Sequence, residues 1–448
     1  MPMADLVTEK THKLRKNQKP PAHHKPSKSH KSSSKTPKTT AKPLTETKQD
    51  LTLSDWLEVF AYAEANPAIR QIDIVRYFVL AEAYAAAQQN NRLIVGGLDN
   101  SVGVAGGWVG GGGHGAFAPR YGLGIDNAIQ FTVVTANGDH VTANAHSHPD
   151  LFWALRGGGP GTFGVVTSVT YKTQPIEPLV ASAIRANFTS TEIAKSVGTE
   201  FFKLQPKVAE SQWGGYTFYR PDSFTHILYA TNVTMEEINE TIEPFVKHLN
   251  STAGENNVEV SVFPASSFYE INGKLNKPLD RPVGINVEMA SRMYTKNLYE
   301  TESAKMAGEF LKISSSLGVG IAHVAGGAVS QVDPDSVGLH PHWRDTPALV
   351  FIGIQWEDGA SAAEIQAQKD VMKQNIDILE GLEPGRGSYV NEGSFYEPNP
   401  QRTFFGDHYN RLMEIKDQYD PSELFLVANG VGSDRWDKGL NCRRGQLQ

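Results

Sequence analysis

The sequence predicts an α+β fold, and three features support this prediction. Between residues 176 and 384, short β-like runs such as "YTFYR" and "ALVFIGIQW" alternate with helical runs, which is typical of an antiparallel sheet with helices on one face. The pair Asn137-Gly138 lies between two apolar runs and predicts a β-hairpin. The stretch 101–127 is rich in glycine, with four in a row at 110–113, and therefore predicts a loop rather than a helix.

The N-terminal region differs in composition from the rest of the chain. Residues 1–50 are rich in Lys, Pro, Ser, Thr and His and poor in apolar residues, so we expect a disordered basic tail. Apolar spacing predicts two short helices over 51–80, the first capped by Ser54 and the second beginning near Arg70. This pair resembles part of a helix-turn-helix of the pogo-transposase or centromere-protein-B type, although no groove-reading helix follows Phe78.

The remaining elements follow from apolar periodicity and from turn residues. We expect a final helix over 406–419, closed by Asp420-Pro421. The other predicted elements are strands over 128–134, 140–144, 161–173, 182–189, 216–220, 227–234 and 348–356, and helices over 147–157, 241–250, 298–318 and 361–382.

Composition excludes several classes of protein. The 448 residues have a net charge of −7, but the first 45 hold an excess of Lys and Arg, so an acidic body follows a basic tail. Cys442 is the only cysteine, which excludes an intrachain disulfide and a cysteine metal cluster. No apolar run is long enough to span a membrane, and no signal peptide is expected at the N-terminus. The localisation stays open, because four Asn-x-Ser/Thr sequons would suit a secreted protein: Asn187, Asn232, Asn239 and Asn250.

Short motifs give weaker signals. Gly110, Gly112 and Gly115 match the pattern GxGxxG, but Pro119 prevents the helix that a dinucleotide fold needs there. A surface loop that binds no ligand is the alternative. His340 and His342 have no third ligand nearby, so we expect no metal site.

Longer motifs resemble a known family. The stretch "GGLDNSVGVAGGWVGGGGHGAFAPRYGLGIDN", the following "DLFWALRGGGPGTFGVVTSVTYKTQP" and the C-terminal "SYVNEGSFYEPNPQRTFFGDHYNRL" resemble the berberine-bridge-enzyme-like FAD-linked oxidases of the vanillyl-alcohol-oxidase superfamily. The resemblance runs from about Ala81 to Trp436. It implies an FAD-binding second subdomain over 81–175, an antiparallel-sheet substrate lobe over 176–384, and a segment over 385–448 that completes the FAD domain. It also implies that the family's first flavin subdomain is missing.

The resemblance implies site residues as well. Asp99 stands where some relatives bind FAD through cysteine, so we expect FAD to be non-covalent. Glu392 stands where the family usually has a catalytic tyrosine, so it is either the catalytic base or a surface glutamate with no role. Tyr389 is the next candidate base. His114 either faces the flavin pocket or is a structural loop residue. The other residues implied to bind FAD are Gly96, Gly97, Val102, Gly103, Gly106, Gly107, Gly164, Val165, Val166 and Asn391.

The implied function is that of an FAD-dependent oxidoreductase. A small alcohol, sugar or secondary metabolite would give a hydride to the flavin, and O2 would reoxidise it. The first alternative is a DNA-binding protein that uses the basic tail, although we expect nucleic-acid binding to be weak and non-specific. The second alternative is an inactive remnant of an oxidase.

Overall fold

The computed structural model describes residues 79–272 and 285–444, all within the unit Asp50–Gln448. The predicted tail over 1–50 and the predicted helices before residue 79 lie outside the described residues.

A seven-stranded sheet forms the centre of the larger lobe, and all its neighbouring strands are antiparallel. Its order is β10-β12-β11-β7-β8-β6-β9. The predicted strands over 182–189, 216–220, 227–234 and 348–356 all lie in this sheet, shifted by a few residues. The strands are β6 (Leu179–Asn187), β7 (Gly214–Tyr219), β8 (Ser223–Thr231), β9 (Val258–Ala265), β10 (Val287–Met293), β11 (Val319–His323) and β12 (Leu349–Gln355).

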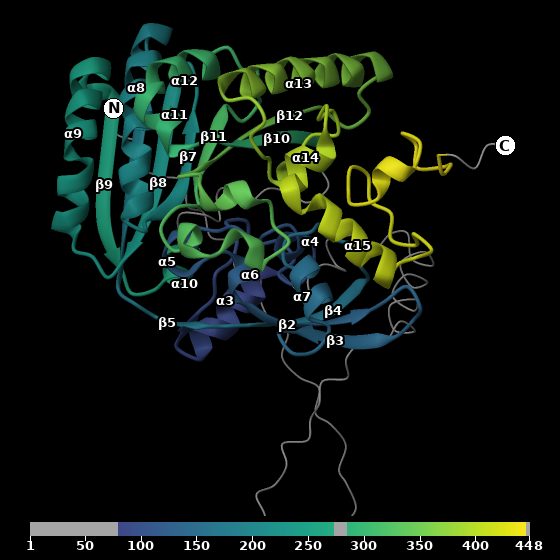
Figure 1. Ribbon diagram of the computed structural model, residues 1–448. Coiled ribbons are helices and arrows are strands. Elements are labelled where there is room, and N and C mark those ends of the chain that lie inside the picture. Colours follow the sequence, from purple (N-terminus) through teal and green to yellow (C-terminus); the bar gives the residue numbers. More distant parts are fainter. Residues whose placement is uncertain (1–78, 273–284, 445–448) are drawn as a thin grey trace, which may run out of the picture. The chain divides into compact units, whose positions relative to one another are not determined.

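Helices cover one face of this sheet (Figure 1). The longest begin with Ser or Thr caps, which accept a backbone N–H of the first turn, as Ser361 does from Glu364. The predicted helix 298–318 is wrong in extent: the chain forms two helices, broken at Glu302, and ends the second at Phe310. No helix of the described residues is long and apolar enough to cross a membrane. The helices are α8 (Thr191–Glu210), α9 (Met235–Ala253), α11 (Lys296–Thr301), α12 (Ser303–Phe310) and α13 (Ala362–Leu382).

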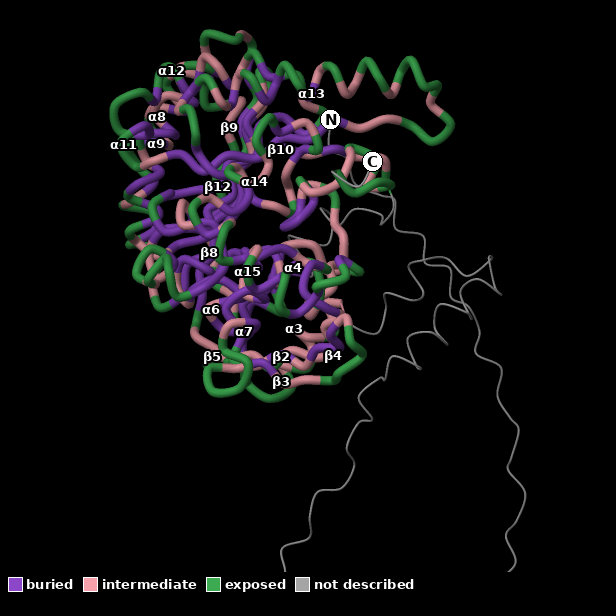
Figure 2. The backbone as a smooth tube through the Cα atoms, turned by 45° about the vertical axis from the view of Figure 1, so that its right-hand side comes forward, coloured by how far each residue is buried: buried purple, intermediate pink, exposed green. Residues whose placement is uncertain are grey.

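The two faces of the sheet belong to two different hydrophobic cores. Because successive strand residues point to opposite faces, Tyr219 of β7 packs among the helices while Tyr216 packs toward the glycine-rich stretch. Figure 2 shows that most central strands of the sheet are buried, whereas helix α13 is largely exposed. The second face of the sheet is therefore available to form a site.

A smaller lobe holds the predicted hairpin and the glycine-rich stretch, where the expected loop is interrupted by three helices of four residues each. The hairpin is confirmed, since β2 and β3 pair antiparallel on either side of Gly138, whose φ is +84°. The order β3-β2-β4 forms one sheet, and β1 pairs with β5. The elements are α3 (Leu80–Gln89), β1 (Arg92–Leu93), α4 (Gly107–Gly110), α5 (Ala118–Tyr121), α6 (Gly124–Asn127), β2 (Ala128–Val134), β3 (His140–Asn144), α7 (Pro149–Leu155), β4 (Val165–Tyr171), β5 (Gln174–Pro175) and α10 (Phe268–Ile271).

The C-terminal segment packs beside this lobe. The predicted helix 406–419 begins later than expected, as α15 at Tyr409, after a short 3-10 turn. The remaining elements are α14 (Pro400–Phe405), α15 (Tyr409–Tyr419) and the 3-10 turns η1 (Glu255–Asn257), η4 (Val329–Gln331), η5 (Pro334–Ser336), η6 (Pro341–Arg344), η7 (Val390–Glu392), η8 (Gly406–His408) and η9 (Ser433–Arg435).

Candidate active site

A cavity of about 750 Å³ lies between the glycine-rich stretch and the open face of the large sheet. We call it the main cavity. Three parts of the chain line it: the glycine-rich region, the sheet and the turn η7. Its lining residues are Gly97, Leu98, Asp99, Val102, Gly107, Trp108, His114, Tyr216, Phe218, Ile285, Val287, Met289, Leu317, Phe351, Gln355, Tyr389, Asn391 and Glu392.

Two further cavities each share a lining residue with the main one, and we call the three the connected cavities. The first, of about 270 Å³, shares Gly107 with it and is also lined by Gly106, Gly164, Val165 and Val166. The second, of about 460 Å³, shares Asn391 with the main cavity. The three cavities therefore adjoin, which suits an elongated ligand such as a dinucleotide.

Glycine occupies positions in this region for two different physical reasons. A side chain at Gly106 or Gly107 would meet no protein atom within 4 Å, so these positions face open space. The four consecutive glycines differ, because each packs against other protein atoms. A Cβ at Gly111 would lie 2.5 Å from the Asn391 amide, and one at Gly113 would lie 3.0 Å from Gly124. The packing of the protein itself therefore accounts for the four consecutive glycines.

His114 and Glu392 meet at the inner end of the main cavity. The distance from His114 Nε2 to Glu392 Oε1 is 2.9 Å, although the two residues are 278 positions apart. His114 is 9% exposed, and its ring stacks with that of Trp343 at 6.2 Å. The two residues form a hydrogen-bonded acid–base pair, which we call the His–Glu pair.

Three buried polar atoms around this pair have no hydrogen-bond partner among the described residues. They are His114 Nδ1, Glu392 Oε2 and the hydroxyl of Tyr216. Leaving such an atom unpaired costs about 1–3 kcal/mol. All three residues line the main cavity, so a bound ligand is the natural source of the missing partners.

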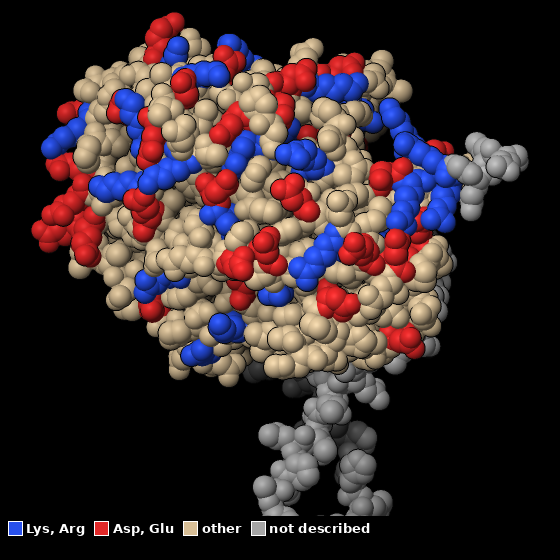
Figure 3. Space-filling view, in the orientation of Figure 1, with Lys and Arg blue, Asp and Glu red and all other residues tan. Residues whose placement is uncertain are grey.

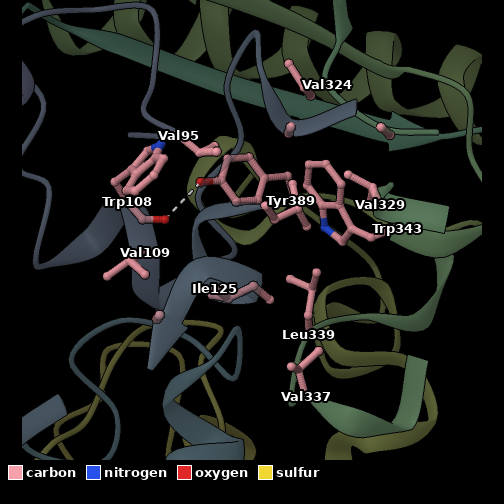
Figure 4. Packing of buried hydrophobic residues seen from close by; sticks show 14 of the residues in the cluster. Val95, Trp108, Val109, Ile125, Val324, Val329, Val337, Leu339, Trp343 and Tyr389 are labelled. Carbon is pink, nitrogen blue, oxygen red and sulfur yellow. Dashed lines mark hydrogen bonds between the residues drawn. The ribbon is translucent and has the colours of Figure 1, made fainter. Parts of the chain in front are cut away.

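The turn η7 holds Glu392 in place through its neighbours. The backbone N–H of Tyr389 donates to Ser291 Oγ on β10, at 3.0 Å. The Asn391 amide donates to the Gly107 carbonyl and to the Tyr389 hydroxyl, both at 2.7 Å. Figure 4 shows the Tyr389 ring between Trp108 and Trp343. The C-terminal segment is thereby tied to both the sheet and the glycine-rich stretch.

Burial raises the pKa of two tyrosines that line the main cavity, Tyr389 and Tyr216. It raises the pKa of Tyr389, and the nearby Glu392 carboxylate adds to this effect. Burial also raises the pKa of Tyr216 well above its ordinary value. Both hydroxyls therefore keep their protons at neutral pH and can donate a hydrogen bond.

Most of the residues expected to bind FAD line the connected cavities, with two exceptions. Gly96 is buried, and a Cβ there would lie 2.4 Å from the Tyr84 hydroxyl, so this glycine packs against α3. Gly103 forms an isolated bridge with Val79 and faces open space, but it is not among the residues that line the cavities. Among the described residues no group of three or more His, Cys, Asp or Glu could hold a metal ion.

Sequence reasoning missed Trp108 and Tyr216. Trp108 donates its indole N–H to the His114 carbonyl at 3.0 Å and so shapes the turn that presents this histidine. Tyr216 lies two residues before Phe218 in "YTFYR", and this period of two places both aromatic rings on one face. This alternation in the sequence could have identified Tyr216 as a residue of the site.

Comparison with known proteins agrees with this geometry. The profile of the berberine and berberine-like family matches residues 388–432, and that of an FAD binding domain matches 78–144. An FAD-linked oxidoreductase of Penicillium thymicola is 31% identical over 87% of this chain and 69% of its own length. The chain belongs to the berberine-like FAD-linked oxidoreductases. FAD is the cofactor of this family, and the connected cavities lined by bare glycines fit it.

Two more relatives show the extent of the match. An uncharacterized FAD-linked oxidoreductase of Arthroderma benhamiae is 33% identical over 81% of this chain and 65% of its own length. A crystal structure of a VAO-type flavoprotein from Myceliophthora thermophila superposes with a TM-score of 0.72 and 27% identity, over 80% of this chain and 66% of that one. This berberine-like chain thus spans about two thirds of the length of these relatives.

Proposed function

We propose that this chain is an FAD-dependent oxidoreductase that oxidises a small organic molecule bearing a hydroxyl, such as an alcohol, a sugar or a secondary metabolite. The observation that supports it is the His–Glu pair, which lies at the inner end of a cavity bordered by Gly107. The chemistry that FAD supplies when bound is acceptance of a hydride, with O2 as the final electron acceptor.

The chain's own residues would move the proton. Glu392 Oε2 is buried and unpartnered, so it is placed to accept the proton of a substrate hydroxyl while His114 Nε2 holds the other carboxylate oxygen. Tyr216 would donate a hydrogen bond to the substrate oxygen. Gly106, Gly107 and the pair Val165 and Val166 would line the cofactor, and Asn391 would hold Gly107 in position.

The DNA-binding alternative has no support from these relatives, which are FAD-linked oxidoreductases. On the face drawn in Figure 3, Lys and Arg side chains are interspersed with Asp and Glu.

The first test is the visible absorbance spectrum of the purified full chain, before and after incubation with FAD and removal of free cofactor. We expect the flavin band to remain with the protein. Anaerobic mixing with a panel of alcohols and sugars should then bleach the band for at least one compound. A chain that retains no flavin would contradict the proposal and favour the inactive-remnant alternative.

A further inference from the structure

The large sheet gives the main cavity an apolar wall. Val287 and Met289 lie two positions apart on β10, so both side chains point to the same face of the sheet, where they line the cavity. Phe218 of β7 and Phe351 of β12 contact each other edge to face, with ring centroids 6.1 Å apart. Leu317, just before β11, completes the wall.

Strand register shows how polar and apolar groups are distributed along this wall. Val287 pairs with Gln355 in the outer row, and Ile285 beyond it is 37% exposed. Tyr216 lies in the innermost row. In this row Tyr216 and Leu349 of β12 both pair with the same residue of β11, which lies between them. These rows are six positions apart along β12, or about 20 Å at ~3.3 Å per residue. Apart from Gln355 at its mouth, the wall is therefore apolar, and it meets the His–Glu pair only at its inner end.

The opposite side of the cavity, which includes residues expected to bind FAD, is also largely apolar. Leu98, Val102 and Trp108 line it, and Asp99 at the partly exposed rim accepts a hydrogen bond from Ser101. None of the described residues that line this cavity is Lys or Arg. The cavity thus has no cation for a carboxylate or phosphate group. Apart from Asp99 and Gln355, its polar side chains belong to Tyr216, His114, Tyr389 and the turn η7, so the rest of its lining offers no side-chain partner for a row of hydroxyls.

We propose that the main cavity binds a neutral, largely apolar alcohol, with an aromatic or polycyclic body along the sheet and its hydroxyl at the His–Glu pair. This inference rests on the proposed function and selects one substrate class from it. A sugar would place several hydroxyls against Phe, Met, Val and Leu, and each hydroxyl left unpaired there lowers affinity by roughly tenfold. An apolar ring system gains from the same contacts.

The test compares two probes by isothermal titration calorimetry, using the full chain with added FAD. We expect naphthalen-2-ylmethanol to bind at least about tenfold more tightly than cellobiose. Met289→Gln keeps the length of the side chain, and Val287→Thr keeps its shape. Each should weaken binding of the naphthyl alcohol by about tenfold.

Met235→Gln is the matched control, because Met235 is exposed on α9 and does not line the cavity. It should leave the affinity unchanged, and circular dichroism should show all three variants folded. Equal or tighter binding of cellobiose would overturn the inference. So would an unchanged affinity for the naphthyl alcohol in both cavity variants.

Parallel anaerobic flavin reduction separates this inference from the proposed function. Tight naphthyl alcohol binding without reduction by any compound tested would support the apolar cavity and count against the oxidoreductase. Reduction by cellobiose without naphthyl alcohol binding would support the oxidoreductase and overturn the apolar substrate class.

Discussion

At the residue scale, we expect Gly107 to matter for cofactor binding but not for the stability of the fold. A side chain there meets no protein atom within 4 Å, yet the residue borders two of the connected cavities. Gly107→Ala should therefore change the free energy of unfolding by less than about 0.5 kcal/mol in the absence of FAD. The added methyl group should weaken FAD binding by about tenfold or more, since overpacking costs roughly 1–3 kcal/mol. Fluorescence titration with FAD measures this.

Gly381→Ala is the control for this prediction. Gly381 lies in α13, and a side chain there also meets no atom within 4 Å. This change should raise the free energy of unfolding by about 0.5–1 kcal/mol through helix propensity and leave FAD affinity unchanged. Equal FAD affinities for Gly107→Ala and the unmodified chain would remove Gly107 from the cofactor site.

The second prediction at the residue scale concerns Glu392, the proposed base. Glu392→Gln keeps a hydrogen bond to His114 but cannot accept a proton. Loss of a general base typically slows a reaction by about 10²–10⁴-fold, so flavin reduction should slow by that order. FAD affinity should stay nearly the same. Anaerobic stopped-flow with a substrate that reduces the unmodified chain measures the reduction rate, and fluorescence titration with FAD measures the affinity.

Glu259→Gln serves as the control for this change, because Glu259 is an exposed residue on the edge strand β9. Its reduction rate should equal that of the unmodified chain. If Glu392→Gln also reacts at the normal rate, Glu392 is not the base. Tyr389→Phe would then be the next variant to measure, despite the raised pKa of this tyrosine.

At the element scale, Lys416 connects α15 to two loops that line the cavities. Its ammonium group is fully buried, pairs with Asp420, and donates to the carbonyls of Thr162 and Phe425. Lys416→Met should lower the free energy of unfolding by about 3–5 kcal/mol, because it leaves a buried carboxylate without its cation. Urea denaturation measures the change.

The matched control is Lys247→Met, which breaks an ion pair of the same i,i+4 spacing on α9. Lys247 is 72% exposed, so water screens its pair with Glu243 and little change is expected. Similar losses in the two variants would show that burial of Lys416 is not the source of its contribution.

At the scale of the whole molecule, we predict that FAD binds without a covalent bond. Asp99 stands where some relatives carry a linking cysteine, and the chain's one cysteine, Cys442, is exposed near the C-terminus. Acid precipitation of the FAD-loaded chain should therefore leave the flavin in the supernatant. Flavin that stays with the pellet and migrates with the denatured protein would contradict this. Adding a known covalent flavoprotein to the same precipitation controls for incomplete release.

The sequence by itself determined the features that depend on neighbouring residues. The Asn137-Gly138 turn specifies its hairpin because its backbone conformation is local. The helix over 361–382 begins one residue after the capping residue Ser361. Ordered motifs identified the family and its cofactor. The predicted domain limits and the individual roles of the site residues stay predictions.

Only the tertiary structure decided which side chains meet. Glu392 and His114 were each candidates, but their contact depends on how η7 docks between β10 and the glycine-rich stretch. The break at Glu302 and the packing of Gly111 against Asn391 likewise depend on neighbours far away in the chain. Local patterns encode backbone conformation, whereas contacts across hundreds of residues arise from the packing of whole elements. That packing separates the glycines that face the cavities from those that hold the protein together.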